Sequence, residues 1–181
     1  MYKVTEFTND THAVEIYYDE HATVADALEG FKPNIKVLYA HRRYILGDVK
    51  INPGEFADEE EMVQWLKDTH NAKTIMPLYC YEHGNITVST GAFSCPWDSG
   101  QTGWVISTEE NDEKLIEAAV RTIDMVLQNE VYLLRYVERE TCDLGHEHRS
   151  NPIDSIGHVF DDSHDYEECL EVAKHYFGFE P

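Results

Sequence analysis

The chain has few basic residues and lacks a long apolar run. Of its 181 residues, 14 are Lys or Arg and 35 are Asp or Glu, which gives a formal net charge of −21. A field of this size repels phosphate backbones and anionic lipid surfaces and attracts basic partners. No apolar stretch approaches the roughly 20 residues that a membrane-spanning helix needs. We therefore expect a basic protein as partner, no direct nucleic-acid binding and no membrane association.

Paired cysteine motifs and a leader-like apolar segment are also lacking. The residues that follow Met1 have no apolar region of the kind found in signal peptides. The cysteines are scattered, with no CxxC pair, at Cys80, Cys95, Cys142 and Cys169. We expect a cytoplasmic protein in which these side chains are free thiols.

The acidity has a simpler interpretation as well. Net charge bears on solubility and association rather than on fold, so plain solubility or adaptation to salt would also explain it. A local basic patch at His41, Arg42 and Arg43 leaves nucleic-acid contact open at that one place. With 42% hydrophobic and 12% aromatic residues, the chain is too apolar for a disordered acidic tail.

The apolar periodicity predicts strands and helices in irregular order. Runs rich in β-branched and aromatic residues predict strands at 4–7, 13–18, 35–39, 74–81, 86–90, 104–107, 131–137 and 153–160. Helical spacing predicts helices at 23–31, 58–70, 107–128 and from 165 to about 177. Because helices do not alternate regularly with strands, we predict an α+β fold. It is one domain over residues 1–181, with a mainly antiparallel sheet packed with three to four helices.

The stretch PLYCYEHGNITVSTGAFSCPWDSGQTGWV (77–105) concentrates aromatic, thiol, carboxylate and amide groups between turn residues. Pro96 fixes its own φ and favours an extended Cys95, so we expect 95–101 to be an ordered loop. Loops of this composition commonly carry binding or catalytic residues. The candidates here are Tyr79, Tyr81, His83, Cys95, Trp97, Asp98, Ser99 and Gln101.

Cys95 with His41 or His83 is a possible nucleophile and base. Such a pair requires hydrogen-bond contact in space, and the local signatures of thiol proteases are missing. A structural cysteine is the alternative that we favour.

The segment HRRYILGD (His41 to Asp48) follows a predicted strand. Arg42 or Arg43 could hold an anion such as a phosphate through paired hydrogen bonds. We favour the alternative that one arginine binds the carboxylate of Asp98 or Asp48 and joins the two motif segments, because the chain offers so many carboxylates.

A possible zinc site lies between Cys142 and His148. One thiolate and two imidazoles, from Cys142, His146 and His148, would supply three of four tetrahedral ligands. Cys169, His158 or His164 could complete the set. The spacing is not that of a zinc finger, so an ordinary polar loop is the alternative.

Carboxylates occur in clusters along the whole chain. Duplex DNA carries one charge per ~1.7 Å of axis, and a folded protein studded with carboxylates can present a similar field. Such a mimic would occupy the nucleic-acid channel of a basic enzyme. The candidate surface is Glu59, Glu60, Glu61, Glu109, Glu110, Asp112 and Glu113; solvated helix ends are the alternative.

HRRYILGD and PLYCYEHGNITVSTGAFSCPWDSGQTGWV together resemble a family of small phage and mobile-element proteins with the patterns HRRYxLGD and PLYxYDHSGxTxSTxxFSCPWDSGQxG. The likeness covers about residues 35–107, and this chain has Glu82 where the pattern has Asp. It implies an accessory protein acting against host defence. We expect an inhibitor of the anti-CRISPR or anti-restriction type, without cofactor. A small enzyme or ligand-binding domain built on the Cys95–Gln101 loop with His41 is the second function class.

Overall fold

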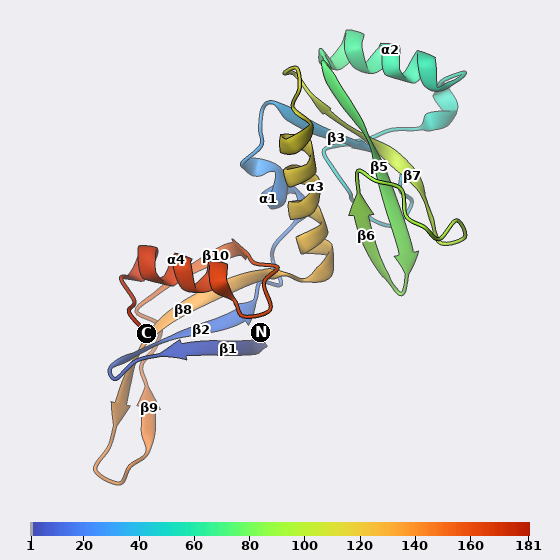
Figure 1. Ribbon diagram of the computed structural model, residues 1–181. Helices are drawn as coiled ribbons and strands as arrows, with labels where there is room; N and C mark the ends of the chain where they lie inside the picture. Colours follow the sequence, from blue (N-terminus) through green and yellow to red (C-terminus); the bar gives the residue numbers. More distant parts are fainter. Residues whose placement is uncertain (1) are drawn as a thin grey trace. The chain divides into compact units, whose positions relative to one another are not determined.

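The computed structural model describes residues 2–181, which form four α-helices and ten strands (Figure 1). Contacts divide the chain into two compact units. The terminal unit contains residues 2–22 and 129–181, and the central unit contains residues 23–128. The predicted α+β class with mainly antiparallel strands is confirmed. The strands form two five-stranded sheets rather than the one sheet expected. The single domain over residues 1–181 stays a prediction.

The terminal unit is an antiparallel sheet in the order β1-β2-β8-β10, with β9 paired to the far end of β8. Helix α4 packs against β8 and β10. Two segments differ from the prediction, because β8 continues to Thr141 and the expected loop 142–151 contains β9. The elements are β1 (Lys3–Thr8), β2 (His12–Tyr18), β8 (Val131–Thr141), β9 (Glu147–Arg149), β10 (Asp154–Phe160) and α4 (Glu167–Phe177).

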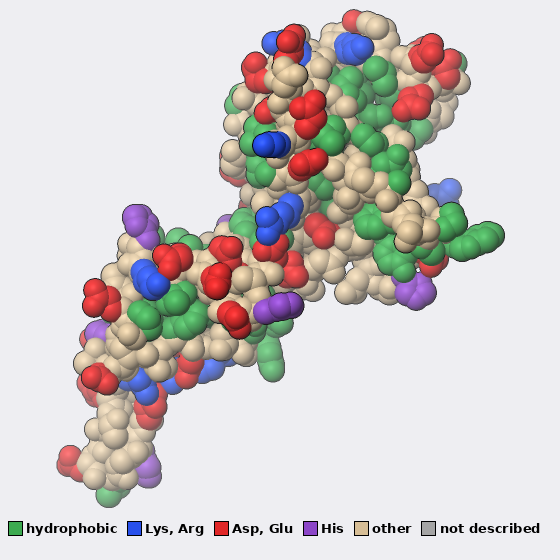
Figure 2. All heavy atoms as spheres, viewed as in Figure 1, with side chains coloured by type: hydrophobic (Ala, Val, Ile, Leu, Met, Phe, Trp, Pro, Cys, Tyr) green, Lys and Arg blue, Asp and Glu red, His purple; other side chains and the backbone are tan. Residues whose placement is uncertain are grey.

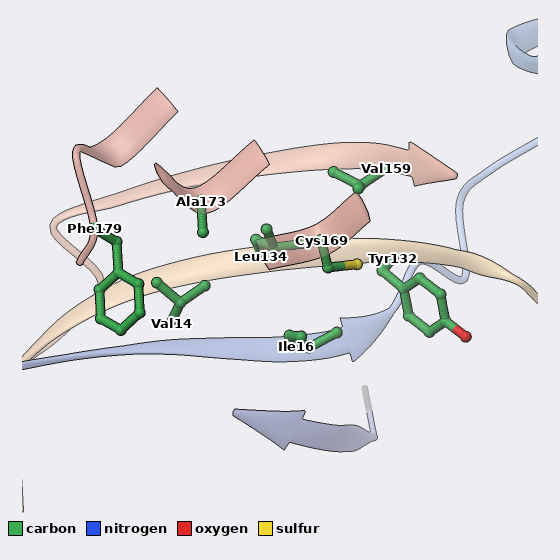
Figure 3. Close-up of a cluster of buried hydrophobic side chains, with 8 residues drawn as sticks. All are labelled: Val14, Ile16, Tyr132, Leu134, Val159, Cys169, Ala173 and Phe179. Atoms are coloured by element: carbon green, nitrogen blue, oxygen red, sulfur yellow. The ribbon is translucent and has the colours of Figure 1, made fainter. Parts of the chain in front are cut away.

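The core of the terminal unit lies between this sheet and α4 (Figure 3). Alternate residues of each strand point to the helix, while Cys169 and Ala173 lie one helical turn apart on α4. Full burial of each large apolar side chain contributes about 1.5–3 kcal/mol. The members are Val14, Ile16, Tyr132, Leu134, Val159, Cys169, Ala173 and Phe179.

The central unit has a sheet in the order β4-β3-β7-β5-β6, in which only the β3–β4 pair is parallel. Leu38 and Ile106 pack with Met62 and Leu66 of α2 on one face. Helix α3 contacts β3, β5, β6 and β7 and also α1. The elements are α1 (Val24–Glu29), β3 (Ile35–Tyr39), β4 (Val49–Lys50), α2 (Glu59–His70), β5 (Thr74–His83), β6 (Asn85–Ser89), β7 (Ser99–Ser107) and α3 (Glu113–Gln128), with a 3-10 turn at Pro53–Glu55.

Helix α3 begins at Glu113, so the prediction of a start at residue 107 or 108 was wrong. Ser107 still belongs to β7, and its hydroxyl donates to the carboxylate of Asp112 at 2.5 Å. The backbone nitrogen of Asp112 donates to Thr74 Oγ1 at 3.3 Å, while Asn111 has a left-handed φ of 58°. These contacts hold 108–112 as a turn, and the helix can begin only after it.

Two other helix starts agree with their capping signals. The side chain of Thr23 accepts from Asp26 N, and the Asp26 carboxylate accepts from Thr23 N in return. At α2, Asp58 accepts from Glu61 N at 2.9 Å. The Glu61 carboxylate accepts from Ala57 N rather than from the cap residue itself. Each bond satisfies a backbone donor that the first helical turn leaves unpaired.

Candidate functional site

The two motif segments meet in the central unit, and Glu82 joins them. HRRYILGD forms the loop between β3 and β4, while Glu82 lies near the end of β5. One carboxylate oxygen of Glu82 lies 3.4 Å from His41 Nε2, and the other pairs with the Arg43 guanidinium. Neighbouring strands would not by themselves fix the position of the β3–β4 loop, so this carboxylate is its main anchor to β5.

His41 is held as a neutral, structural imidazole. Its Nδ1 accepts from the backbone nitrogens of Arg43 and Tyr44 at 3.2 and 3.1 Å. Because Nδ1 is an acceptor, the ring proton is on Nε2 and faces Glu82. Burial lowers the pKa of His41, and the nearby charges of Arg43 and Lys50 lower it further. His41 therefore orders its own loop, and both of its nitrogens are engaged there.

The segment from Cys95 to Gln101 is fixed at several points. The Ser99 hydroxyl donates to the carbonyl of Cys95, and the backbone nitrogen of Glu82 donates to the carbonyl of Asp98 at 2.8 Å. The last three residues, Ser99 to Gln101, begin strand β7 and pair with β5. The predicted loop is thus a short turn followed by a strand.

Asp98 pairs with His83, so the prediction that it binds Arg42 or Arg43 was wrong. Its Oδ2 lies 3.1 Å from His83 Nδ1. Arg43 is occupied by Glu82 instead, because consecutive residues on β5 point to opposite sides of the sheet and Glu82 faces the arginine loop. Asp98 and His83 both have exposed side chains, so this pair contributes little to stability.

Asp48 has a structural role. Its Oδ2 accepts from the backbone nitrogen of Val37 at 2.9 Å. The preceding Gly47 lies so close to this strand that an added Cβ would come within 2.5 Å of the Val37 side chain. Neither arginine of the motif reaches Asp48, and Arg42 is exposed to solvent. The Gly47-Asp48 end of HRRYILGD therefore holds the loop against β3.

Cys95 contacts a carboxylate and not an imidazole. Its sulfur lies 3.8 Å from Asp98 Oδ2. A cysteine nucleophile is normally activated by a neighbouring cation or base. His83 shares the same Asp98 oxygen, and His41 is engaged with Glu82. The arrangement does not assemble the nucleophile–base pair considered from the sequence.

Aromatic side chains of the motif divide between two surfaces. Tyr81 packs on Phe93, with ring centroids 5.8 Å apart. Trp97 is 92% exposed, although its loop is well held. Tyr79 and Gln101 line a groove below α2 together with Trp104, which belongs to the same stretch of sequence. Residues 75, 77 and 79 are alternate positions of one predicted strand, so their side chains share a face of the sheet. This spacing is the sequence signal that could have predicted Tyr79 in the groove.

The predicted zinc ligands lie in the hairpin between β8 and β9. Cys142 N donates to the His146 carbonyl at 3.0 Å, so backbone contacts organise this turn. Glu147 and Arg149, on either side of His148, form ion pairs within the terminal unit. Within residues 2–181, no three His, Cys, Asp or Glu side chains are arranged to hold a metal ion.

Of the predicted acidic surface, Glu59, Glu60 and Glu61 form the first turn of α2. Glu109, Glu110 and Glu113 are exposed before and at the start of α3, whereas Asp112 is half-buried against Ser107. Figure 2 shows Asp and Glu side chains over both units, with few Lys or Arg among them.

Comparison with protein-family models, curated proteins and solved structures found no match. The resemblance to phage and mobile-element proteins therefore stays a prediction. In the part of the chain that the structure describes, each helix is too short or too polar to cross a membrane.

Proposed function

We propose that this chain is a non-catalytic antagonist of a host defence enzyme that handles nucleic acid. It would be carried by a phage or mobile element and act in the host cytoplasm, in the manner of an anti-CRISPR or anti-restriction protein. Its acidic surface would occupy the basic channel in which the enzyme holds DNA or RNA.

The observation that carries this proposal is the scarcity of ion pairs on the acidic surface. Within residues 2–181, only one of its six exposed carboxylates has a Lys or Arg nitrogen within 4 Å, namely Glu109, which lies 3.9 Å from Lys73. Carboxylates without local cations keep their external field, which a basic partner can then neutralise. The six are Glu59, Glu60, Glu61, Glu109, Glu110 and Glu113.

The motif loop gives less support to the alternative of a small enzyme. Cys95 lies against Asp98, and His41 is committed to its own loop. These groups order the fold around Glu82 without presenting an activated nucleophile. The exposed Trp97 suits a binding protein, because tryptophan is enriched among the residues that dominate protein interfaces.

A salt-dependent capture experiment tests the proposal. The tagged protein and the variant Glu109→Gln/Glu110→Gln/Glu113→Gln are used to capture host proteins at low and physiological salt. Asp112 is retained because its carboxylate orders the start of α3. We expect the native protein to enrich a basic nucleic-acid enzyme, with less recovered at higher salt because exposed charges are screened over ~8–10 Å. Equal recovery of the same enzyme by the variant would contradict the proposal.

A further inference from the structure

A groove runs between α2 and the strands β5 and β7 of the central unit. It consists of two adjoining hollows of about 420 and 410 Å³, both lined by Glu59, Gln101 and Trp104. Two of these residues lie in the sequence motif. Neither hollow includes Cys95, Asp98 or His41, so the groove is separate from the contacts described around Glu82.

The floor of the groove is apolar and partly aromatic. Ile75, Pro77 and Tyr79 alternate along β5, so their side chains share one face of the sheet. Across the ladder, Pro77 lies opposite Trp104, and Tyr79 lies opposite Gln101. Strand β6 pairs with β5 only from Tyr79 onward, which explains how a proline without an N–H fits this strand. The half-buried floor from Ile75 to Tyr79 is about 13 Å long at ~3.3 Å per residue.

One end of the groove is basic. Lys67 in the last turn of α2 and Lys73 just before β5 both line it. Glu59 lies eight residues before Lys67 on the same helix, which separates them by about 12 Å along the axis at ~1.5 Å per residue. Lys73 has a weak partner in Glu109 at 3.9 Å. Two lysines beside one hollow are unusual in a chain with only 14 Lys and Arg against 35 acids.

The opposite end carries hydrogen-bonding groups together with the Glu59 carboxylate. The Gln101 side-chain nitrogen is 3.3 Å from the Gly103 carbonyl, a long bond that a ligand could replace, and its amide oxygen is a further acceptor. Tyr79, which pairs with Gln101 across the ladder, also lines this part of the groove. The groove therefore has a cationic end, an apolar middle, and a far end with the Gln101 amide and the Glu59 carboxylate.

We propose that this groove binds a small planar ligand with one anionic end, of the chemical class of a nucleoside monophosphate. Lys67 and Lys73 take the phosphate, Pro77 and Trp104 contact the ring, and Gln101 pairs with the polar edge of the ring. The long-range field of a chain with net charge −21 opposes any anion, so binding depends on these local contacts. The inference does not depend on the proposed antagonist function.

Titration with AMP, followed by NMR of the tryptophan indole and glutamine amide signals, tests the site. Two matched probes each lack one part of AMP: adenosine lacks the charged phosphate, and inorganic phosphate lacks the ring. We expect AMP to shift Trp104 and Gln101 while leaving the exposed Trp97 unchanged, and to bind at least about tenfold more tightly than either fragment.

Matched variants separate the groove from general charge effects. Lys67→Gln/Lys73→Gln should weaken AMP binding about tenfold or more, whereas Lys114→Gln, on the exposed side of α3, should not change it. Gln101→Ala provides an independent variant, and thermal melts check that each variant is folded. No binding at millimolar AMP, equal binding of either fragment, or an equal loss with Lys114→Gln would overturn the proposal.

Discussion

Glu82 is the residue on which the motif region depends most. Its carboxylate faces both His41 and Arg43, and its backbone nitrogen binds the carbonyl of Asp98. The β3–β4 loop and the turn before β7 therefore both contact this one residue of β5, the first through its side chain and the second through its backbone. The Glu82 side chain is long enough to contact the β3–β4 loop from β5.

Glu82→Gln should destabilise the protein by about 0.5–1.5 kcal/mol. The substitution keeps the size of the side chain but removes the charge that binds Arg43 and faces His41; the Glu82 side chain is 27% exposed, whereas that of Arg43 is 71% exposed. Asp98→Asn should cost less, about 0–1 kcal/mol, because its pair with His83 is exposed. Urea unfolding measures both, with Glu117→Gln on the exposed face of α3 as control. An Asp98 variant less stable than the Glu82 variant would contradict this order.

At the scale of elements, α3 protects the open edge of the central sheet. Strand β6 is the last in the order, and its outer backbone nitrogen at Val88 donates to Asp124 at 2.8 Å. The Thr87 hydroxyl donates to the same oxygen at 2.7 Å, and the Gln128 amide donates to the Ile86 carbonyl. Side chains of a helix thus take the place of a neighbouring strand, which would otherwise be a template for aggregation.

Asp124→Ala should therefore destabilise the protein by about 1–3 kcal/mol, since it leaves the Val88 N–H without its acceptor. Glu117→Ala, on the same helix but exposed, should change the free energy of unfolding by less than about 0.5 kcal/mol. Hydrogen exchange of the Val88 amide gives a local readout that a general loss of stability would not mimic. Unchanged protection at Val88 in Asp124→Ala would contradict the assignment.

In the terminal unit, Arg149 of β9 joins three strands. It binds Glu6 of β1 at 3.0 Å, Glu15 of β2 at 2.9 Å and Glu147 of its own strand at 2.9 Å. The Arg149 hydrogen bond lowers the pKa of Glu6 from 4.5 to about 2, although partial burial opposes this shift. These ion pairs of Arg149 thus help to hold the short strand β9 against the sheet.

This pKa shift predicts a specific pH dependence. A carboxyl whose folded pKa is depressed stabilises the protein above its unfolded pKa, near 4.5, and this contribution is lost as the pH falls toward 2. Arg149→Met should lower the free energy of unfolding at pH 7 by on the order of 2 kcal/mol and flatten its fall between pH 5 and 2. Lys174→Met removes an exposed pair with Glu171 and is the control. An unaltered slope in Arg149→Met would exclude this ion pair as its cause.

Sequence periodicity predicted the elements better than it predicted their partners. Helix α2 has its predicted cap at Asp58, and β3 and β10 lie close to where alternation placed them. The start of α3 was missed because it depends on contacts of Asp112 with two residues outside the helix. Thr74 is distant in sequence, and Ser107 belongs to strand β7. The partition of strands into two sheets was missed for the same reason, since strand pairing is set by contacts beyond any local window.

The candidate site shows the same limit. The two motif segments are in contact through Arg43 and Glu82, and the prediction of Asp98 as the arginine partner was wrong. The sequence offers several carboxylates, and only the structure shows that Glu82 faces the arginine loop while Asp98 lies beside His83. The groove below α2 could not be predicted without the pairing of β5 with β7, because that pairing places Trp104 beside Pro77.

At the scale of the whole molecule, the charge is the dominant property. The net charge is −21, and acidic side chains are spread over both units. Repulsion among these like charges destabilises the folded state, and added salt weakens this repulsion. We propose that the carboxylates of α2 and of the turn before α3 recognise a basic enzyme, whereas Glu82 ties the β3–β4 loop to β5.

The most direct test of this account is protection of incoming DNA in host cells with an active restriction or CRISPR system. Cells expressing the native protein should be transformed, or infected by phage, more efficiently than cells without it. Cys95→Ala should protect equally well, and Glu109→Gln/Glu110→Gln/Glu113→Gln should lose most of the protection. Full protection by the charge-neutralised variant, together with its loss in Cys95→Ala, would contradict recognition through the acidic surface.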